Sequence, residues 1–391
     1  MQDRGQRLSY GALALGYIAR EQRTMKIIVA GAGIAGLAVA KALELKGHQC
    51  HIVEQSEAPR PGGMGIFLLG NATRALRELG VLDAIEPNAR RIDEQLIFTS
   101  NGRLLHETRS REFWSDCCPC LAMPRSLLVQ SLLSSLRNTE ISYGKAVVNV
   151  EETMSGVRAQ YSDGTSQSCD MVIAADGIKS LLRNNAFQVQ PRSLGITCWR
   201  TVVDNTANIA TWTAMLGPGR TLLAIPVSET RVYLYADCRT ADVPNNTVLG
   251  LRDLFADFKS PLGELLEQLN NPAEIHFGEL QEIPEYSFNR RGLVLVGDAA
   301  HACSPSMAQG AGMALEDALV LADLISRYSS PAIINRAFVA QRRDRVSWVR
   351  KQSRVRDKVR NFPPVVRDLM LRHLGDRLYA RSYSELRKPL M

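Results

Sequence analysis

The stretch Gly31-Ala32-Gly33-Ile34-Ala35-Gly36 decides the fold of this 391-residue chain. It follows a short apolar run at 26–30 that is typical of a buried strand, and it precedes helix-forming residues at 37–45 and a second strand at 50–53. A GxGxxG pattern between a strand and a helix predicts a βαβ unit in which backbone amides and the helix N-terminus hold the pyrophosphate of a dinucleotide. From Met25 onward, the chain therefore begins with a Rossmann-like domain.

The end of the second strand supplies the carboxylate that such a domain uses for ribose. Glu54 lies there, where it can accept hydrogen bonds from the adenosine ribose hydroxyls and would repel a 2′-phosphate. Gln55, next to it, is a further candidate for the adenine side. The chain has one such fingerprint, so the sequence predicts one tightly held dinucleotide and no second nucleotide-binding fold.

Two more predicted strands end next to an aspartate. Asp176-Gly177 follows an apolar run at 171–174, and Gly297-Asp298 follows another at 293–296. In the crevice above the sheet, the Asp298 carboxylate can accept hydrogen bonds from hydroxyl groups of a ligand, with a solvated helix cap as the alternative. Residues 305–312, Pro-Ser-Met-Ala-Gln-Gly-Ala-Gly, then place small side chains at the start of a helix.

Together these motifs resemble those of the single-component flavoprotein aromatic hydroxylases, over residues 25 to about 358. The resemblance implies tightly bound, non-covalent FAD, with the fingerprint on its ADP part, Asp298 on the ribityl chain and Asp176 tied to the use of both FAD and NAD(P)H. It also implies that residues 305–312 hold the flavin pyrimidine edge, where a helix dipole stabilises negative charge on the reduced flavin. Many relatives have Gly where this chain has Ala308.

Two further positions match contacts of that family. Arg125 corresponds to an FAD-contacting arginine, with an ordinary surface arginine as the alternative, and Val147 falls where a backbone contact to adenine is expected. The expected FAD-contacting residues are thus Gly31, Gly33, Ala35, Gly36, Glu54, Gln55, Arg125, Val147, Asp176, Asp298, Gln309, Gly310, Ala311 and Gly312.

The resemblance implies a reaction as well. NADH or NADPH reduces FAD, O2 adds at flavin C4a, and the resulting hydroperoxide transfers one oxygen atom to a small aromatic or heteroaromatic substrate. The cofactor carries this chemistry, so no metal and no catalytic side chain is expected, and His301 is interpreted as structural. Residues 197–200, 314–318 and 350–353 look most similar to the alkylquinolone 3-hydroxylases, with urate and salicylate hydroxylases as broader relatives.

The middle of the chain has a different pattern. The strands at 196–203, 221–227 and 231–236 have no crossover helices between them, which predicts an antiparallel sheet, and a helical stretch at 251–269 follows. Substrate contacts are expected from Trp199, Arg200, Leu223, Tyr233, Tyr235 and Pro305. Side chains alternate along a strand, so only one of Trp199 and Arg200 is expected to face the substrate. Arg200 either binds an anionic group or forms a salt bridge between domains.

The predicted fold is therefore α/β, with a Rossmann-like FAD-binding domain, an antiparallel-sheet substrate domain and C-terminal helices. The expected FAD-binding domain is discontinuous, at 25–194 and 285–330, and the expected substrate domain spans 195–284. Basic helices at 331–391 follow, broken at Pro363-Pro364. Residues 1–24 are interpreted as an extension that need not be ordered.

The net charge of +7 is unevenly distributed. Residues 336–391 hold 16 Lys and Arg against 5 Asp and Glu, so the excess of positive charge lies at the C-terminus. Nucleic acid is not expected as a partner of this segment, and its most straightforward interpretation is a solvated helix face. Contact of the basic helix with an anionic membrane surface stays open as an alternative.

The eight cysteines favour a reduced, cytoplasmic protein. Cys117-Cys118-Pro119-Cys120 contains a CxxC pattern without a second pair or a nearby histidine, so free thiols are expected there in preference to a zinc site.

Three other functions compete with hydroxylation. A flavin-dependent halogenase is disfavoured because a WxWxIP motif is absent. An epoxidase or a tetracycline-inactivating oxygenase would use the same flavin chemistry on another substrate. A non-catalytic FAD-binding or membrane-docking protein would use the basic C-terminal helix as its contact.

Overall fold

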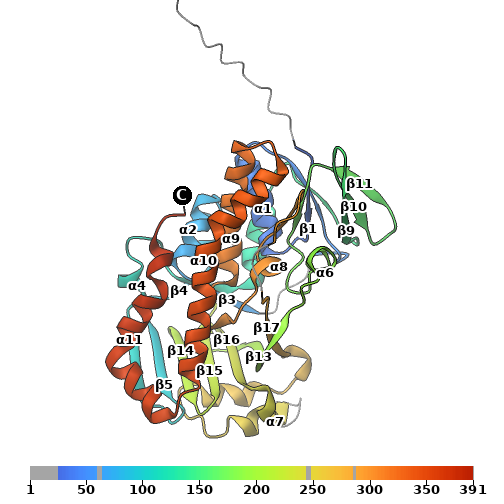
Figure 1. Ribbon diagram of the computed structural model, residues 1–391. Coiled ribbons are helices and arrows are strands. Elements are labelled where there is room, and N and C mark those ends of the chain that lie inside the picture. Colours follow the sequence, from blue (N-terminus) through green and yellow to red (C-terminus); the bar gives the residue numbers. More distant parts are fainter. Residues whose placement is uncertain (1–24, 60–63, 244–247, 285–287, 391) are drawn as a thin grey trace, which may run out of the picture.

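The computed structural model describes residues 25–59, 64–243, 248–284 and 288–390. The predicted extension at 1–24 and the start of the segment expected from residue 285 lie outside these ranges. Figure 1 shows a parallel sheet with its helices at one end of the molecule and a large, mainly antiparallel sheet at the other, while two long C-terminal helices run along one side.

The parallel sheet has five strands in the order β18-β12-β1-β2-β8. These are β18 Leu293–Leu295, β12 Met171–Ala174, β1 Ile27–Ala30, β2 Cys50–Val53 and β8 Glu140–Ser142. The helix α1 (Ile34–Leu45) connects β1 to β2, which confirms the predicted βαβ unit. Every residue of β1 is buried, as expected for a strand covered on both faces.

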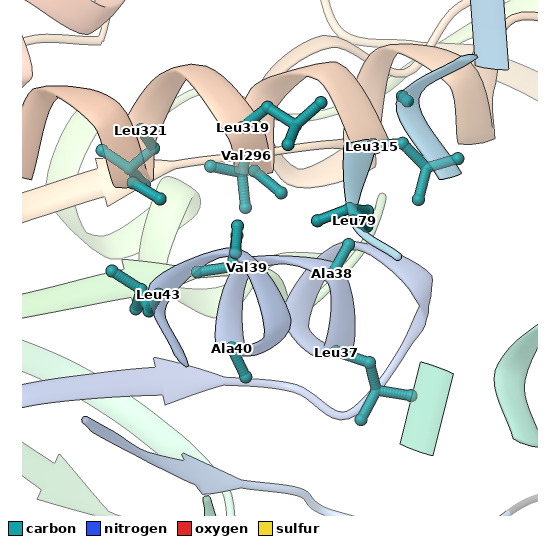
Figure 2. Close-up of a cluster of buried hydrophobic side chains, with 14 of the residues drawn as sticks. Leu37, Ala38, Val39, Ala40, Leu43, Leu79, Val296, Leu315, Leu319 and Leu321 are labelled. Atoms are coloured by element: carbon teal, nitrogen blue, oxygen red, sulfur yellow. The ribbon is translucent and has the colours of Figure 1, made fainter. Parts of the chain in front are cut away.

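The packing of α1 against α9 (Gly310–Arg327) forms the core of this end of the molecule. Figure 2 shows Val39 and Leu43 of α1 facing Leu319 and Leu321 of α9, and all four side chains are buried. Burial of one such side chain contributes about 1.5–3 kcal/mol relative to exposure. Helix α9 begins at the edge of the sheet where β1 and β18 end, so this core positions the region expected to hold a flavin.

The second sheet has seven strands in the order β17-β13-β16-β15-β14-β5-β6. These are β17 His276–Glu282, β13 Arg192–Asp204, β16 Arg231–Arg239, β15 Arg220–Pro226, β14 Trp212–Gly217, β5 Gln95–Thr99 and β6 Leu104–Thr108. The boundary expected at residue 195 does not separate the sheets, because the hairpin β5–β6 lies before it and β5 pairs with β14 in parallel. One face of this sheet carries a cluster of buried hydrophobic side chains that includes Trp199, Leu222 and Leu234, which we call the outer core. Phe98 of β5 packs against the outer core, so the hairpin belongs to the seven-stranded sheet.

The remaining elements are short. Two sheets of three strands contain β3 (Gly65–Leu68), β7 (Leu121–Pro124) and β4 (Arg90–Arg91), and β11 (Ser166–Cys169), β10 (Gly156–Tyr161) and β9 (Val147–Thr153). The other helices and 3-10 turns are α2 Gly70–Glu78, α3 Leu82–Ile85, η1 Glu86–Asn88, α4 Ser110–Phe113, α5 Arg125–Ser134, α6 Leu181–Phe187, η2 Thr240–Asp242, η4 Pro272–Glu274, α8 Asp298–His301 and η5 Pro305–Met307. The expected helix at 251–269 is instead α7 (Val248–Leu254) and η3 (Gly263–Gln268), since Pro261 lies between them and cannot continue a helix.

The C-terminal helices are α10 (Pro331–Arg360) and α11 (Pro364–Arg387), and the chain breaks at Pro363-Pro364 as predicted. Their basic residues are not all on a solvated face, however. Arg342, Arg350 and Arg367 are buried. The composition of a segment gives the number of its charges but not their partners, and the partners of these arginines lie on other segments of the chain. None of the helices described is both long and apolar enough to cross a membrane.

Arg342 is the centre of a buried ionic cluster. Its Nε donates to Asp317 Oδ1 at 2.7 Å and its Nη1 donates to Glu316 Oε2 at 3.0 Å, while Arg345 also donates to Glu316. Burial acts to raise the pKa of both carboxyls. The guanidinium groups, with His301 beside Asp317, outweigh that effect, so both pKa values lie below their ordinary ones.

We expect Arg342→Met to lower the free energy of unfolding by about 3–5 kcal/mol, because two buried carboxylates would each lose one of their charge partners. Urea denaturation measures this, with Arg343→Met on the exposed face of the same helix as the control, expected to stay within about 0.5 kcal/mol. The stabilisation is present above the ordinary pKa values of 3.8 and 4.5 and is lost as the pH falls through the lowered ones. Equal effects of the two substitutions would contradict a central role for Arg342.

Candidate functional site

The three glycines of the fingerprint have different surroundings. A Cβ on Gly31 would lie 2.6 Å from the Ala175 carbonyl oxygen, and one on Gly36 would lie 1.9 Å from the Gly31 carbonyl oxygen. A Cβ on Gly33 would meet nothing within 4 Å. Gly31 and Gly36 are therefore needed for packing of the chain on itself, whereas Gly33 opens a space at the N-terminus of α1. No side chain among the described residues caps that helix end, so its amides can receive an anion.

Glu54 is held at the edge of this space by backbone donors. Its Oε2 accepts from the Ala32 N–H at 2.8 Å and its Oε1 accepts from the Ser56 N–H at 2.9 Å. A carboxylate has about four lone-pair sites, so these contacts orient Glu54 and leave acceptor capacity for ribose hydroxyls. The Lys145 N–H donates to the Glu54 carbonyl, which brings the segment before Val147 alongside. Gln55 is exposed nearby.

Asp298 faces an interior opening. Its side chain is exposed although Gly297 and Ala299 on either side are buried. Desolvation nevertheless raises the pKa of its carboxyl, against the opposing effects of His301 and Arg125. A carboxyl that protein surrounds but that borders an interior space is both accessible and desolvated, as the Asp298 carboxyl is. A Cβ on Gly310 would lie 3.7 Å from Asp298 Oδ1, so the space adjoins the N-terminus of α9.

One carboxylate oxygen of Asp176 accepts no hydrogen bond from the described residues. Its Oδ2 accepts weakly from the Leu182 N–H at 3.4 Å. Its Oδ1 is buried and has no hydrogen-bond partner among the described residues, and burial raises the pKa of the carboxyl. A buried acceptor without a partner is costly, so this atom is suited to a donor that is not part of the protein chain.

The expected flavin-contacting residues at the start of α9 divide into two groups. The Gln309 side chain is buried and exchanges two hydrogen bonds with Asn71 of α2, and a Cβ on Gly312 would lie 3.2 Å from Ala72 Cβ. These two side-chain positions join α9 to α2. Gly310 is exposed and Ala311 is half-buried, so their backbone is accessible.

His301 and the turn before it are held by Asp317. His301 Nε2 lies 2.6 Å from Asp317 Oδ2, and the same oxygen accepts from the Gly297 N–H at 2.9 Å. His301 is buried, in agreement with its structural interpretation. A Cβ on Gly297 would lie 3.0 Å from Ala35 Cβ, so Ala35 packs beneath this turn.

The seven-stranded sheet places four of the predicted substrate residues on one face. Arg200 pairs with Tyr235 across β13 and β16, and Tyr235 pairs with Leu223 across β16 and β15. Paired residues share a face, as do residues two apart, so Tyr233 lies there too. We call this the inner face. Trp199 lies on the opposite face, where it packs into the outer core with Leu234, Leu251 and Leu266, so it is not brought to the candidate site.

Arg200 connects the inner face to the flavin-side residues. The pKa of Arg125 is affected by the charges of both Asp298 and Arg200, so the three side chains lie within electrostatic reach of one another. Arg200 Nε is buried and has no hydrogen-bond partner among the described residues. The ion pair on this face is made not by Arg200 but by Arg360.

Arg360, at the end of α10, forms a second polar group with Asp237 and Tyr235. Its Nη1 donates to Asp237 Oδ1 at 2.9 Å, and the Tyr235 hydroxyl donates to Asp237 Oδ2 at 2.7 Å. Arg360 Nε and Nη2 are buried without partners among the described residues. Burial raises the pKa of Asp237, although Arg360 acts to lower it.

Pro305 lies near this group and is exposed. Asp357 of α10 accepts from the Ser306 hydroxyl at 2.6 Å and from the Ser304 hydroxyl at 3.0 Å, which fixes the turn η5 that contains Pro305. Cys117, Cys118 and Cys120 are buried free thiols, and the described residues contain no cluster of three or more His, Cys, Asp or Glu that could hold a metal ion.

A family model described as FAD binding domain matches residues 24–332, which is most of the chain. The chain belongs to this FAD-binding family. Two bacterial enzymes are similar to the flavoprotein over most of its length. The 2-heptyl-3-hydroxy-4(1H)-quinolone synthase of Pseudomonas aeruginosa is 32% identical over 339 residues, covering 84% of this chain and 88% of that enzyme. The FAD-dependent urate hydroxylase of Klebsiella pneumoniae is 32% identical over 342 residues, covering 82% and 87%.

Solved structures agree with this assignment. Klebsiella pneumoniae HpxO, crystallised with FAD and uric acid, has a TM-score of 0.84 at 27% identity, covering 95% of the flavoprotein and 99% of HpxO. The tetracycline destructase Tet(51) has a TM-score of 0.71 at 22% identity, covering 92% and 98%, and shares the fold alone. The flavoprotein is therefore an FAD-dependent oxidoreductase, and its α/β fold is confirmed.

The residues of the flavoprotein fit its cofactor. Gly33 leaves room for a pyrophosphate, the Asp176 Oδ1 atom lacks a donor, and the accessible Asp298 carboxyl lies beside the free N-terminus of α9. These features suit the hydroxyl-rich, anionic chain that joins the two ring systems of FAD.

Sequence reasoning missed two groups in the flavoprotein. Asp317 and Arg342 hold the turn that carries Asp298, and Asp237 and Arg360 form the second polar group of the inner face. The only local signal was the spacing of Tyr233, Tyr235 and Asp237 along one strand, which places all three on the same face. Nothing near Arg360 in the sequence indicates its partner.

We expect Gly33→Ala to leave the fold intact but to weaken FAD binding by about tenfold or more, because its methyl group would occupy the space that the pyrophosphate needs. Fluorescence titration of the deflavinated protein with FAD measures the affinity. Gly36→Ala is the matched comparison, and its Cβ would overlap the Gly31 carbonyl, so it should lower stability even without FAD. An unchanged FAD affinity in Gly33→Ala would contradict this placement of the pyrophosphate.

Proposed function

We propose that this enzyme uses NAD(P)H and O2 to hydroxylate a small aromatic or heteroaromatic compound. The carrying observation is that Arg125 directly follows Pro124, whose strand partner Gly65 packs on Tyr233 of the inner face, and that the charges of Asp298, on the flavin side, and of Arg200 both act on Arg125. A flavin near Asp298 would therefore lie next to a substrate bound at Arg200. The similar enzymes support a ring substrate, since their names give a quinolone and urate.

When bound, FAD would accept a hydride from the nicotinamide and activate O2, so the protein itself needs no nucleophile or metal. The protein residues bind and orient. Gly33 leaves room for the pyrophosphate, Gly31 and Gly36 allow the tight turn that holds it, and Glu54 accepts from the adenosine ribose. Asp298 accepts from the ribityl chain, while Asp176 accepts from the cofactor through Oδ1 or positions the nicotinamide.

Arg200 would bind an oxygen atom of the substrate ring. Transfer of an electrophilic oxygen to a ring carbon is favoured by high electron density on the ring. A guanidinium group beside a ring oxygen stabilises negative charge there, and so favours the electron-rich, deprotonated or enolate-like form of the substrate. Because Arg200 Nε is buried without a protein partner, a substrate oxygen would also satisfy that donor.

Tyr233 and Leu223 would pack against the ring, and the Asp237–Arg360 pair would form the polar far end of the same space. Burial raises the pKa of the Tyr233 hydroxyl, so it stays protonated at neutral pH and can donate a hydrogen bond. The expected substrate is therefore a planar ring with an oxygen that can carry negative charge, facing Arg200.

Stopped-flow reduction of the purified flavoprotein by NADH and by NADPH tests this function, with quinolones, salicylates, purines and hydroxybenzoates as ligands. We expect one class to accelerate flavin reduction and to gain about 16 mass units, the addition of one oxygen atom. Reduction that forms only hydrogen peroxide with every ligand would contradict hydroxylation of these ring classes, and absence of any reduction would favour a non-catalytic FAD-binding protein.

We expect Arg200→Gln to reduce kcat/KM for the active ligand by about tenfold to a hundredfold, the loss of a hydrogen bond to a charged group. The FAD affinity should stay unchanged, and Arg200→Lys should recover part of the activity. Trp199→Phe is the control, because it changes the neighbouring residue on the opposite face and should leave KM unaltered. A larger effect of Trp199→Phe than of Arg200→Gln would show that the substrate lies on the other face.

A further inference from the structure

Exposed apolar side chains gather at the connection between α10 and α11. Thirteen large hydrophobic residues of the described chain are exposed, and six of them lie between residues 355 and 374. They are Val355, Phe362, Val365, Val366, Leu369 and Leu374, with Val365 81% and Leu369 58% exposed. We call this cluster the apolar turn. Single exposed apolar residues are ordinary, but such a concentration marks a contact surface.

Positive charges surround the apolar turn. Lys351, Arg354 and Lys358 are exposed on the outer side of α10, and Arg372 and Arg377 are exposed on α11. Residues 351–377 contain eight Lys and Arg and three Asp. All three have partners, since Asp368 pairs with Arg367, Asp357 accepts from Ser304 and Ser306, and Asp376 Oδ1 lies 3.5 Å from His106 Nε2. Three of the cations are paired as well, Arg354 with Glu282, Arg360 with Asp237 and Arg367 with Asp368. The solvent-facing charge of this surface is still positive, because Lys351, Lys358, Arg372 and Arg377 are exposed against one exposed carboxylate, Asp376.

The turn is fixed to the inner face of the seven-stranded sheet. Arg360, just before Phe362, forms the ion pair with Asp237. Arg367, in the first turn of α11, donates to the Gly217 carbonyl at 2.8 Å and to the Leu216 carbonyl at 3.2 Å. Figure 1 shows α10 and α11 meeting at the end of the molecule that carries this sheet. Whatever binds the apolar turn is thus held close to the candidate substrate site.

We propose that the apolar turn docks on an anionic phospholipid bilayer and that the enzyme takes its substrate from that surface. Apolar side chains entering the headgroup region, with Lys and Arg around them, are the pattern of helices that lie on such membranes. A second copy of the chain would bring like charges together, and nucleic acid would leave the apolar side chains in water. The link to substrate uptake rests on the proposed function, since a substrate with an apolar ring partitions into lipid.

Co-sedimentation of the full-length FAD-loaded protein with vesicles tests the docking. We expect binding to vesicles that contain phosphatidylserine, at least about tenfold weaker binding to pure phosphatidylcholine, and weakening of the former by added salt. The double variant Leu369→Ser with Lys358→Glu should lose about tenfold or more in vesicle affinity. The matched control is Met154→Ser with Arg158→Glu, an exposed apolar residue and an exposed cation on the remote β9–β10 hairpin, which should bind as the parent does.

Sedimentation does not depend on catalysis, so it separates the two proposals. Docking is overturned if the parent ignores anionic vesicles, if both double variants bind equally, or if Leu369→Ser with Lys358→Glu instead abolishes self-association in sedimentation velocity. Substrate uptake from the bilayer is supported if anionic vesicles lower KM for the active ligand in the parent and not in the turn variant, whose KM without lipid should be unchanged. If anionic vesicles change KM equally in the parent and in the turn variant, substrate uptake from the bilayer is overturned. If the parent binds vesicles but turns over none of the ligands, the result counts against the proposed function alone.

Discussion

The buried contact of Asp317 with Arg342, His301 and the Gly297 amide is the constraint on which the rest of the site depends. One carboxylate on α9 accepts from the turn that carries Asp298, from the histidine one turn later and from an arginine on α10. Burying these charges is unfavourable unless every partner is present. The complete cluster therefore fixes α9, α10 and the Gly297–Asp298 turn relative to one another.

Some small residues of the site are needed for close packing of the chain, and others leave space for a ligand. Gly36, Gly312 and the pair Ala35 and Gly297 lie where the chain approaches itself, and larger side chains there would separate α1, α9 and the sheet. Among the described residues, a Cβ on Gly33 would meet no atom within 4 Å, and one on Gly310 would meet Asp298 Oδ1 at 3.7 Å. The glycines of one motif are thus not equivalent, and only the surroundings of each show which of them serve the ligand.

Local patterns in the sequence predicted the parts of the fold that depend on neighbouring residues. The GxGxxG turn, Glu54 and the alternation that separates Trp199 from Arg200 all follow from spacing along one or two elements. The parallel pairing of β5 with β14 could not be predicted, because its partner lies more than a hundred residues later and a hairpin alone does not say which sheet it joins. The buried arginines of α10 were interpreted as solvated for a related reason, since Glu316 and Asp237 lie on distant elements.

The flavin side and the inner face of the candidate site both contribute positive charge. The charges of Asp298 and Arg200 both act on Arg125, and the N-terminus of α9, which no side chain among the described residues caps, adds positive potential beside Asp298. Burial lowers the pKa of Arg125 and the charge of Arg200 adds to that effect, while Arg200 Nε has no hydrogen-bond partner among the described residues, so the arrangement is unfavourable for the protein by itself. It becomes favourable when anionic groups enter. Negative charge on the flavin ring or on a substrate oxygen would relieve the repulsion between these positive groups.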